Sequence, residues 1–148
     1  MILNGENVTS LLRTEETGKM ASKTSKYAAV RTKLVALQRG LAKKTDVIMD
    51  GRDIGTTVLP DAFAKIYLTA SSDARAKRRY DELKEKGENR SFDAIKEDIE
   101  KRDYEDMHRA ISPLKQADDA VLVDTSDMNI EQVVAVLSKI IDEKKAGR

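Results

Sequence analysis

The sequence has no cysteine, no tryptophan and only one histidine, and aromatic residues make up 4% of its 148 positions. Without cysteine there can be no disulfide and no thiolate metal site, and a single histidine excludes a site built from several histidines. The lack of cysteine fits a reducing cytoplasm. No serine stands in a spacing that implies a histidine–acid triad, so a hydrolase mechanism has no support.

Long apolar runs are also missing. The first residues, 1–6, lack the basic flank and apolar stretch of a signal peptide, and no apolar run approaches the length of a membrane-spanning helix. The 27 basic residues nearly cancel the 26 acidic ones, whereas proteins that bind nucleic acids or membrane surfaces usually carry a basic excess. We therefore expect a soluble cytoplasmic protein that binds neither nucleic acid nor membrane.

What remains is the pattern of an α/β fold. Apolar residues make up 40% of the chain and charged residues 36%, which is a globular composition. Short apolar or alternating runs predict strands at 47–49, 66–70 and 120–123. Helical periodicity or composition predicts helices at 29–42, 73–86, 92–109 and after Asn129. Strands that alternate with helices favour a mainly parallel sheet flanked by helices.

Three finer expectations concern local structure. Asn4-Gly5 predicts a hairpin turn because both residues tolerate positive φ. Since only three residues precede it, we interpret the chain as starting inside a structural element. Asn129 and Gln132 predict a variant capping box at the start of the last helix. The apolar positions of that helix predict its buried face: Ile130, Val133, Val134, Leu137 and Ile141.

The segment after the first expected strand is the first candidate site. In open α/β sheets ligands bind beyond the carboxyl ends of the strands, where residues 50–56 (DGRDIGT) fall. Gly51 and Gly55 allow tight turns, and the planar guanidinium of Arg52 suits phosphate oxygens. A structural turn with an Arg–Asp ion pair is an equally good interpretation of these residues alone.

Two further charged clusters lie on expected helices. Arg102, Asp106 and Arg109 share one helical face and could clamp a phosphate and a ribose, although local chemistry favours a solvated row of ion pairs. The run 75–79 (RAKRR) could meet transferring phosphates, but such runs are more often a solvated face. We expect His108 to be a packing or surface residue rather than a catalyst.

A phosphate-binding loop, G-x-x-x-x-G-K-[ST], is absent. Its backbone amides and lysine would cradle the phosphates of a nucleoside triphosphate. Gly18 is the one glycine followed by a lysine, and Arg13 stands where the first glycine of the motif would be. The 148 residues therefore carry no recognisable site for a triphosphate.

Six segments, in the right order, closely resemble the signatures of bacterial cytidylate kinases. They are 4–9 (NGENVT), 47–56 (VIMDGRDIGT), 58–62 (VLPDA), 102–109 (RDYEDMHR), 112–114 (SPL) and 117–120 (ADDA). The resemblance runs through essentially the whole chain, and these segments are specific to that family rather than to kinases in general.

The resemblance implies an enzyme of pyrimidine nucleotide metabolism. The family transfers the γ-phosphoryl group of ATP to CMP or dCMP, with Mg²⁺, and has the fold of phosphate-binding-loop nucleoside monophosphate kinases. By resemblance, residues 1–45 are part of the monophosphate-binding region. Residues 46–148 are the α/β core, with a lid at about 75–100. The first strand and the phosphate-binding loop of that fold have no counterpart here.

The resemblance also assigns roles to single residues. Ser22, Arg31 and Asp53 are expected to read cytosine, because two donors and one acceptor complement its pairing edge. Arg52 and Arg109 are expected to bind the monophosphate, and Arg102 with Asp106 the sugar and phosphate. The lid residues that would close on the transferring group are Arg75, Arg78 and Arg79. No metal ligand is assigned.

The missing loop and strand lead to two more expectations. We expect the chain by itself to be inactive as a kinase, and to self-associate through an exposed sheet edge or to be a fragment of a longer protein. The alternatives are a CMP-binding module without catalysis, a kinase for another nucleoside monophosphate, and an interaction protein whose charged helices only resemble a site.

Overall fold

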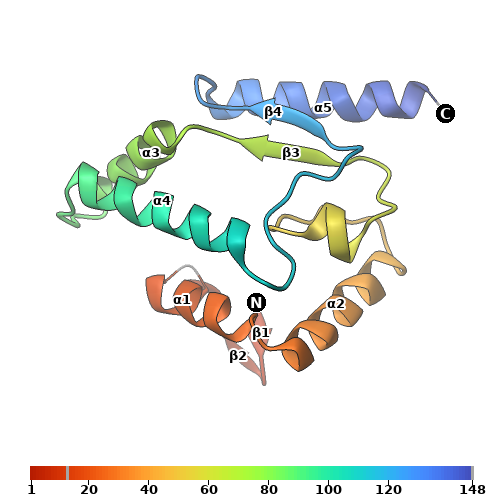
Figure 1. Ribbon diagram of the computed structural model, residues 1–148, viewed down its shortest axis with the longest axis horizontal. Helices are drawn as coiled ribbons and strands as arrows, with labels where there is room; N and C mark the ends of the chain where they lie inside the picture. The colour runs from red at the N-terminus through yellow and green to blue at the C-terminus, as the bar shows by residue number, and fades with distance from the viewer. Residues whose placement is uncertain (13, 148) are drawn as a thin grey trace. The chain divides into compact units, whose positions relative to one another are not determined.

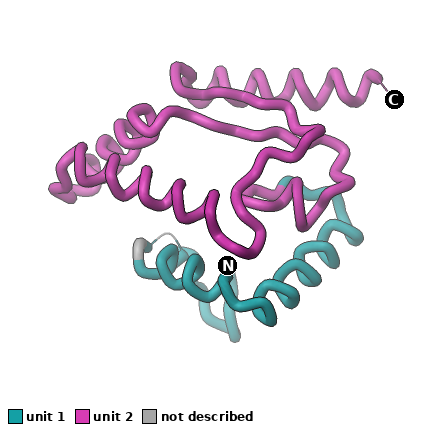
Figure 2. Tube along the Cα trace, in the orientation of Figure 1, with its two compact units in different colours: residues 1–48 teal, residues 49–148 magenta. Residues whose placement is uncertain are grey.

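The computed structural model describes residues 1–12 and 14–147, and it divides into two compact units. The N-terminal unit is Met1–Ile48 and the C-terminal unit is Met49–Arg148 (Figure 2). This division lies close to the one after residue 45 that the family resemblance implies. Each unit is described by itself.

The N-terminal unit is a short hairpin followed by helices. The hairpin turns at Asn4 and Gly5, whose φ angles of 51° and 88° are both left-handed, as the Asn-Gly pair predicts. None of its described side chains is buried. The elements are β1 (Ile2–Leu3), β2 (Glu6–Asn7), η1 (Thr9–Leu11), α1 (Glu15–Thr24) and α2 (Ala28–Ala42).

The C-terminal unit has the α/β architecture that the sequence predicts. Strands β3 and β4 pair in parallel, with Ile66 opposite Val121 and Thr69 opposite Asp124. Helices α4 and α5 lie on opposite sides of this strand pair (Figure 1). The elements are η2 (Ile54–Val58), β3 (Ile66–Thr69), α3 (Ser72–Glu85), α4 (Phe92–His108), β4 (Val121–Asp124) and α5 (Ile130–Ala146).

The prediction of a strand at 47–49 is wrong, because these residues form no regular structure. A strand needs a neighbour that accepts its backbone hydrogen bonds. Among the described residues, β3 and β4 pair only with each other, and no strand runs beside 47–49. Ile48 is accordingly 99% exposed. The apolar run therefore has the composition of a strand, but it lacks the neighbouring strand with which it would have to pair.

Helices α3 and α4 pack against each other and contain most of the small core. Ala76, Leu83 and Ile95 are almost fully buried there. Tyr80 and Phe92 meet edge to face at their border, with ring centroids 6.4 Å apart. Ser71 and Ser91 cap the two helices, each accepting a hydrogen bond from a first-turn amide.

Helix α5 confirms one prediction and corrects another. The capping box of Asn129 and Gln132 is present in both directions. The predicted buried face is only partly covered: Val133, Leu137 and Ile141 are half-buried, Ile130 is 80% and Val134 56% exposed, and no described residue of α5 is fully buried. Two strands offer too narrow a surface to cover a helix of 17 residues. No helix in the described part of the chain has both the length and the apolar character needed to span a membrane.

Candidate functional site

The first two predicted clusters, the 50–56 segment and the group of Arg102, Asp106 and Arg109, are in contact within the C-terminal unit. Arg52 donates from Nε to Oδ2 of Asp106 at 2.9 Å, joining the loop after Met49 to helix α4. Asp106 is buried, with 8% exposure, whereas the side chain of Arg52 is 43% exposed. Arg52 therefore forms an ion pair with an aspartate of the second cluster, 54 residues away, and this aspartate is not part of a solvated row.

Arg109 completes the surroundings of Asp106 from the end of the same helix. Its Nη1 lies 3.8 Å from Oδ1 of Asp106, and its Nε donates to the carbonyl of Ser112 at 2.5 Å. The carbonyl of Asp106 accepts from the amide of Leu114 at 2.7 Å, so the chain after α4 folds back over its last turn. Two guanidinium groups thus flank one buried carboxylate.

Asp53 precedes an unusual turn. It is 8% exposed, and its carbonyl accepts hydrogen bonds from the amides of Thr57 and Val58 at 2.8 and 3.2 Å, which starts the π-helical turn η2. Single π turns are rare and frequent at functional sites. A Cβ on Gly51 would lie 2.9 Å from Cγ1 of Ile54, so any larger residue there would force the Ile54 side chain to shift. Arg52 and Asp53 thus stand between a closely packed glycine and the π-helical turn.

A cavity of about 420 Å³ lies in the C-terminal unit, and Gly51, Arg52 and Ile54 are among the residues that line it. It extends along β3 to the carboxyl ends of β3 and β4, where ligands bind in parallel sheets. Its charged lining residues are Asp50, Arg52, Lys65, Arg75, Arg78, Asp103 and Lys115. Its volume is that of a small-molecule site.

The three lid candidates have different partners. Arg75 pairs with Asp103 through two hydrogen bonds of 2.9 and 2.5 Å, and the hydrogen bond with Asp103 raises the pKa of Arg75. Arg78 donates to the carbonyls of Thr125 and Met128 in the turn before α5. Arg79 donates to Glu82 at 2.8 Å on the outer face of α3.

The remaining predicted residues lie further apart. Arg102 is exposed on α4, one turn before Asp106. Ser22 is exposed on α1 and Arg31 is half-buried on α2. Both belong to the N-terminal unit, so the three predicted cytosine readers are divided between the two units, with Asp53 in the other.

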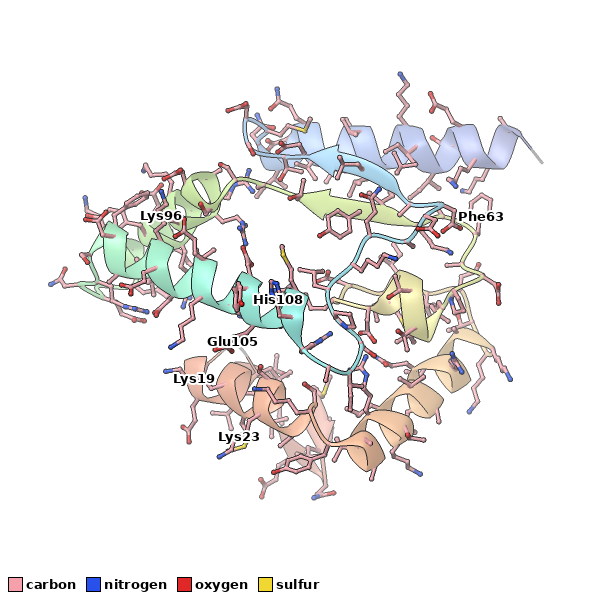
Figure 3. All side chains as sticks on the ribbon, in the orientation of Figure 1. Lys19, Lys23, Phe63, Lys96, Glu105 and His108 are labelled. Atoms are coloured by element: carbon pink, nitrogen blue, oxygen red, sulfur yellow. The ribbon has the colours of Figure 1, made fainter. Side chains whose placement is uncertain are left out.

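Sequence reasoning missed Asp103 as a partner of Arg75. The two residues are 28 positions apart and on different helices, so no i, i+4 spacing connects them. His108 behaves as expected for a surface residue. It is the last residue of α4 and is exposed (Figure 3). Its ring stacks on that of Tyr104, with ring centroids 4.0 Å apart.

Comparison with known proteins identifies the family of the chain. The cytidylate kinase family model matches residues 1–143. The chain is 52% identical over 143 residues to a cytidylate kinase of Lactobacillus johnsonii, covering 97% of this chain and 62% of that protein. It is 47% identical over 142 residues to a cytidylate kinase of Thermosipho melanesiensis, covering 96% of this chain and 65% of that protein. A cytidylate kinase of Bacteroides thetaiotaomicron is 49% identical over 137 residues, with 93% and 60% covered. The chain thus spans less than two thirds of the length of these relatives, and it belongs to the cytidylate kinase family.

Proposed function

We propose that this chain carries the CMP-binding side of an ATP-dependent kinase that converts CMP or dCMP to CDP or dCDP. The Arg52–Asp106 contact is the observation that supports this most. It brings together two charged clusters that are 54 residues apart and would otherwise be ordinary surface features. The relatives are cytidylate kinases, which supports the same substrate.

Arg52 and Arg109 are the proposed ligands of the monophosphate. A guanidinium presents several donors in one plane, which suits phosphate oxygens. The buried carboxylate of Asp106 accepts a hydrogen bond from Arg52 and lies 3.8 Å from a terminal nitrogen of Arg109, so it holds both cations at this place. Arg102 and Asp106 are proposed to engage the sugar and phosphate. Such positioning of charge supplies most of the catalysis in phosphoryl transfer.

Ser22, Arg31 and Asp53 are the proposed readers of the base. Asp53 would accept a hydrogen bond from the amino group of cytosine and would repel the carbonyl that uracil has in its place. One such contact is worth about 1–3 kcal/mol of discrimination. Replacement of Asp53 by asparagine should therefore reduce the preference for CMP over UMP.

The ATP side of the reaction is proposed to lie largely outside these 148 residues. The sequence has no phosphate-binding loop, and the described residues contain no group of three acidic or histidine side chains that could hold a metal ion. We therefore assign no Mg²⁺ ligand and derive no step through the metal. Arg75, Arg78 and Arg79 remain proposed lid residues that close on the transferring group.

Calorimetric titration of the chain with CMP and with UMP tests this function. We expect selective CMP binding, a lower affinity for CMP in Asp106→Asn, and no CDP formation when ATP is added. Asp81→Asn is the matched control, because Asp81 pairs with Lys77 on the exposed face of α3. Equal affinity for CMP and UMP would contradict the proposal, and CDP formation would contradict the expectation that the chain alone is inactive.

A further inference from the structure

Arg75 joins three elements of the C-terminal unit through one side chain. It lies in the first turn of α3, and its Nε donates to the carbonyl of Ala70, directly after β3, at 3.0 Å. Its two terminal nitrogens donate to the two carboxylate oxygens of Asp103 on α4. The end of β3, the start of α3 and the middle of α4 are therefore fixed to one planar group.

This pair differs from the other polar contacts between α3 and α4. Lys96 reaches Asp73 at 2.8 Å and Ser72 reaches Glu100 at 2.9 Å, but Asp73 is 66% and Glu100 54% exposed. Figure 3 shows Lys96 on the part of α4 next to α3. Exposed single contacts of this kind contribute little and tolerate small shifts. The Arg75–Asp103 pair has two parallel hydrogen bonds and fixes orientation as well as distance.

Asp103 also stands three residues before Asp106 on the same helix. Residues i and i+3 are neighbours on one helical face. Helix α4 is thus attached at two successive points, through Asp103 to Arg75 and through Asp106 to Arg52.

We propose that Asp103 is a positioning residue. By binding Arg75 it fixes the rotation of α4 relative to the end of β3, so that Asp106 meets Arg52 and the proposed monophosphate site is formed before the nucleotide arrives. The effect on nucleotide binding rests on the proposed function, whereas the effect on the rotation of α4 does not. Preorganisation of this kind lowers the cost of binding.

Hydrogen exchange of the arginine side-chain N–H groups, followed by NMR, tests the proposal on the 148-residue chain. In Asp103→Asn we expect exchange of the Nη–H groups of Arg75 to become about tenfold faster, because they lose the carboxylate that accepts from them. Exchange of the Nε–H of Arg52 should become about tenfold faster as well, because Asp106 is then a less well-oriented acceptor. CMP affinity should fall about tenfold in the same variant. Arg75→Lys keeps the charge but not the planar fork, and should accelerate exchange at Arg52 in the same way.

Asp81→Asn is the control and should leave exchange at Arg52 unchanged. Faster exchange at Arg75 with an unchanged rate at Arg52 would overturn the proposal, since Asp103 would then act only locally. If Asp103→Asn fails to fold, the exchange rate at Arg52 in Arg75→Lys tests the proposal instead. If the unmodified chain binds no CMP, the proposed function fails, while the rate at Arg52 still decides whether Asp103 positions α4.

Discussion

In the two units of this chain, the apolar content of a helix and the burial of its side chains run in opposite directions. Helix α2 has a regular apolar stripe, yet Leu34, Leu37 and Leu41 are 47–57% exposed. Helix α3 is far more charged, and its Ala76 and Leu83 are nearly fully buried. All buried residues among those described belong to the C-terminal unit. Apolar periodicity therefore indicates a helix, whereas burial depends on a second surface that fits it.

The largest contrast is expected from a pair of leucine substitutions. Leu83→Ala should lower the free energy of unfolding by about 2–5 kcal/mol, because it leaves a cavity between α3 and α4. Leu37→Ala should cost less than about 0.5 kcal/mol, because that side chain is 54% exposed. Urea unfolding measures both. Equal losses would show that α2 is packed as tightly as α3.

Amide hydrogen exchange extends the contrast to the backbone. We expect amides in α3 and α4 to exchange about a hundredfold more slowly than those in α1 and α2, because local opening is easiest where few apolar contacts must break. Mass spectrometry of peptides from the two units would resolve the difference. Similar protection in both would contradict the comparison.

Loss of a helix cap should have a smaller effect. Asn129→Ala removes the capping box of α5 and should cost about 1 kcal/mol. Thr14→Ala removes the cap of α1, where the Thr14 hydroxyl accepts from Thr17 at 3.3 Å, and should cost less in global unfolding because no described side chain of that helix is buried. Thermal unfolding of the two variants compares the two losses of stability. A larger loss for Thr14→Ala than for Asn129→Ala would contradict this expectation.

The smallest effect concerns pH. Lys86 and Arg79 lower the pKa of Glu82 from 4.5 to about 2. Since the folded pKa is the lower one, the stabilisation is present above pH 4.5 and is lost as the pH falls towards 2. In Glu82→Gln the free energy of unfolding should depend slightly less on pH in this window. Because the three side chains are exposed, the difference should shrink in 1 M salt.

Much of the fold could be predicted from the sequence, and the exceptions share one cause. The hairpin at Asn4-Gly5 and the cap at Asn129 depend on neighbouring residues, so local patterns were sufficient. The strand at 47–49 and the buried face of α5 depend on partner surfaces, which a local pattern does not contain.

The same distinction applies to the candidate site. The spacing of Asp106 and Arg109 follows from one helix and was predicted. The contact of Arg52 with Asp106 and that of Arg75 with Asp103 join segments 54 and 28 residues apart. Only the family resemblance suggested that the 50–56 and 102–109 segments work together, and nothing in the sequence indicated Asp103.

The most direct test of the account is a CMP titration followed by amide NMR on the unmodified chain. We expect chemical-shift changes at the proposed nucleotide-binding residues Ser22, Arg31, Arg52, Asp53 and Asp106, with much smaller changes for UMP. Changes confined to residues outside these positions, or none at saturating CMP, would contradict the proposal that these residues bind the nucleotide.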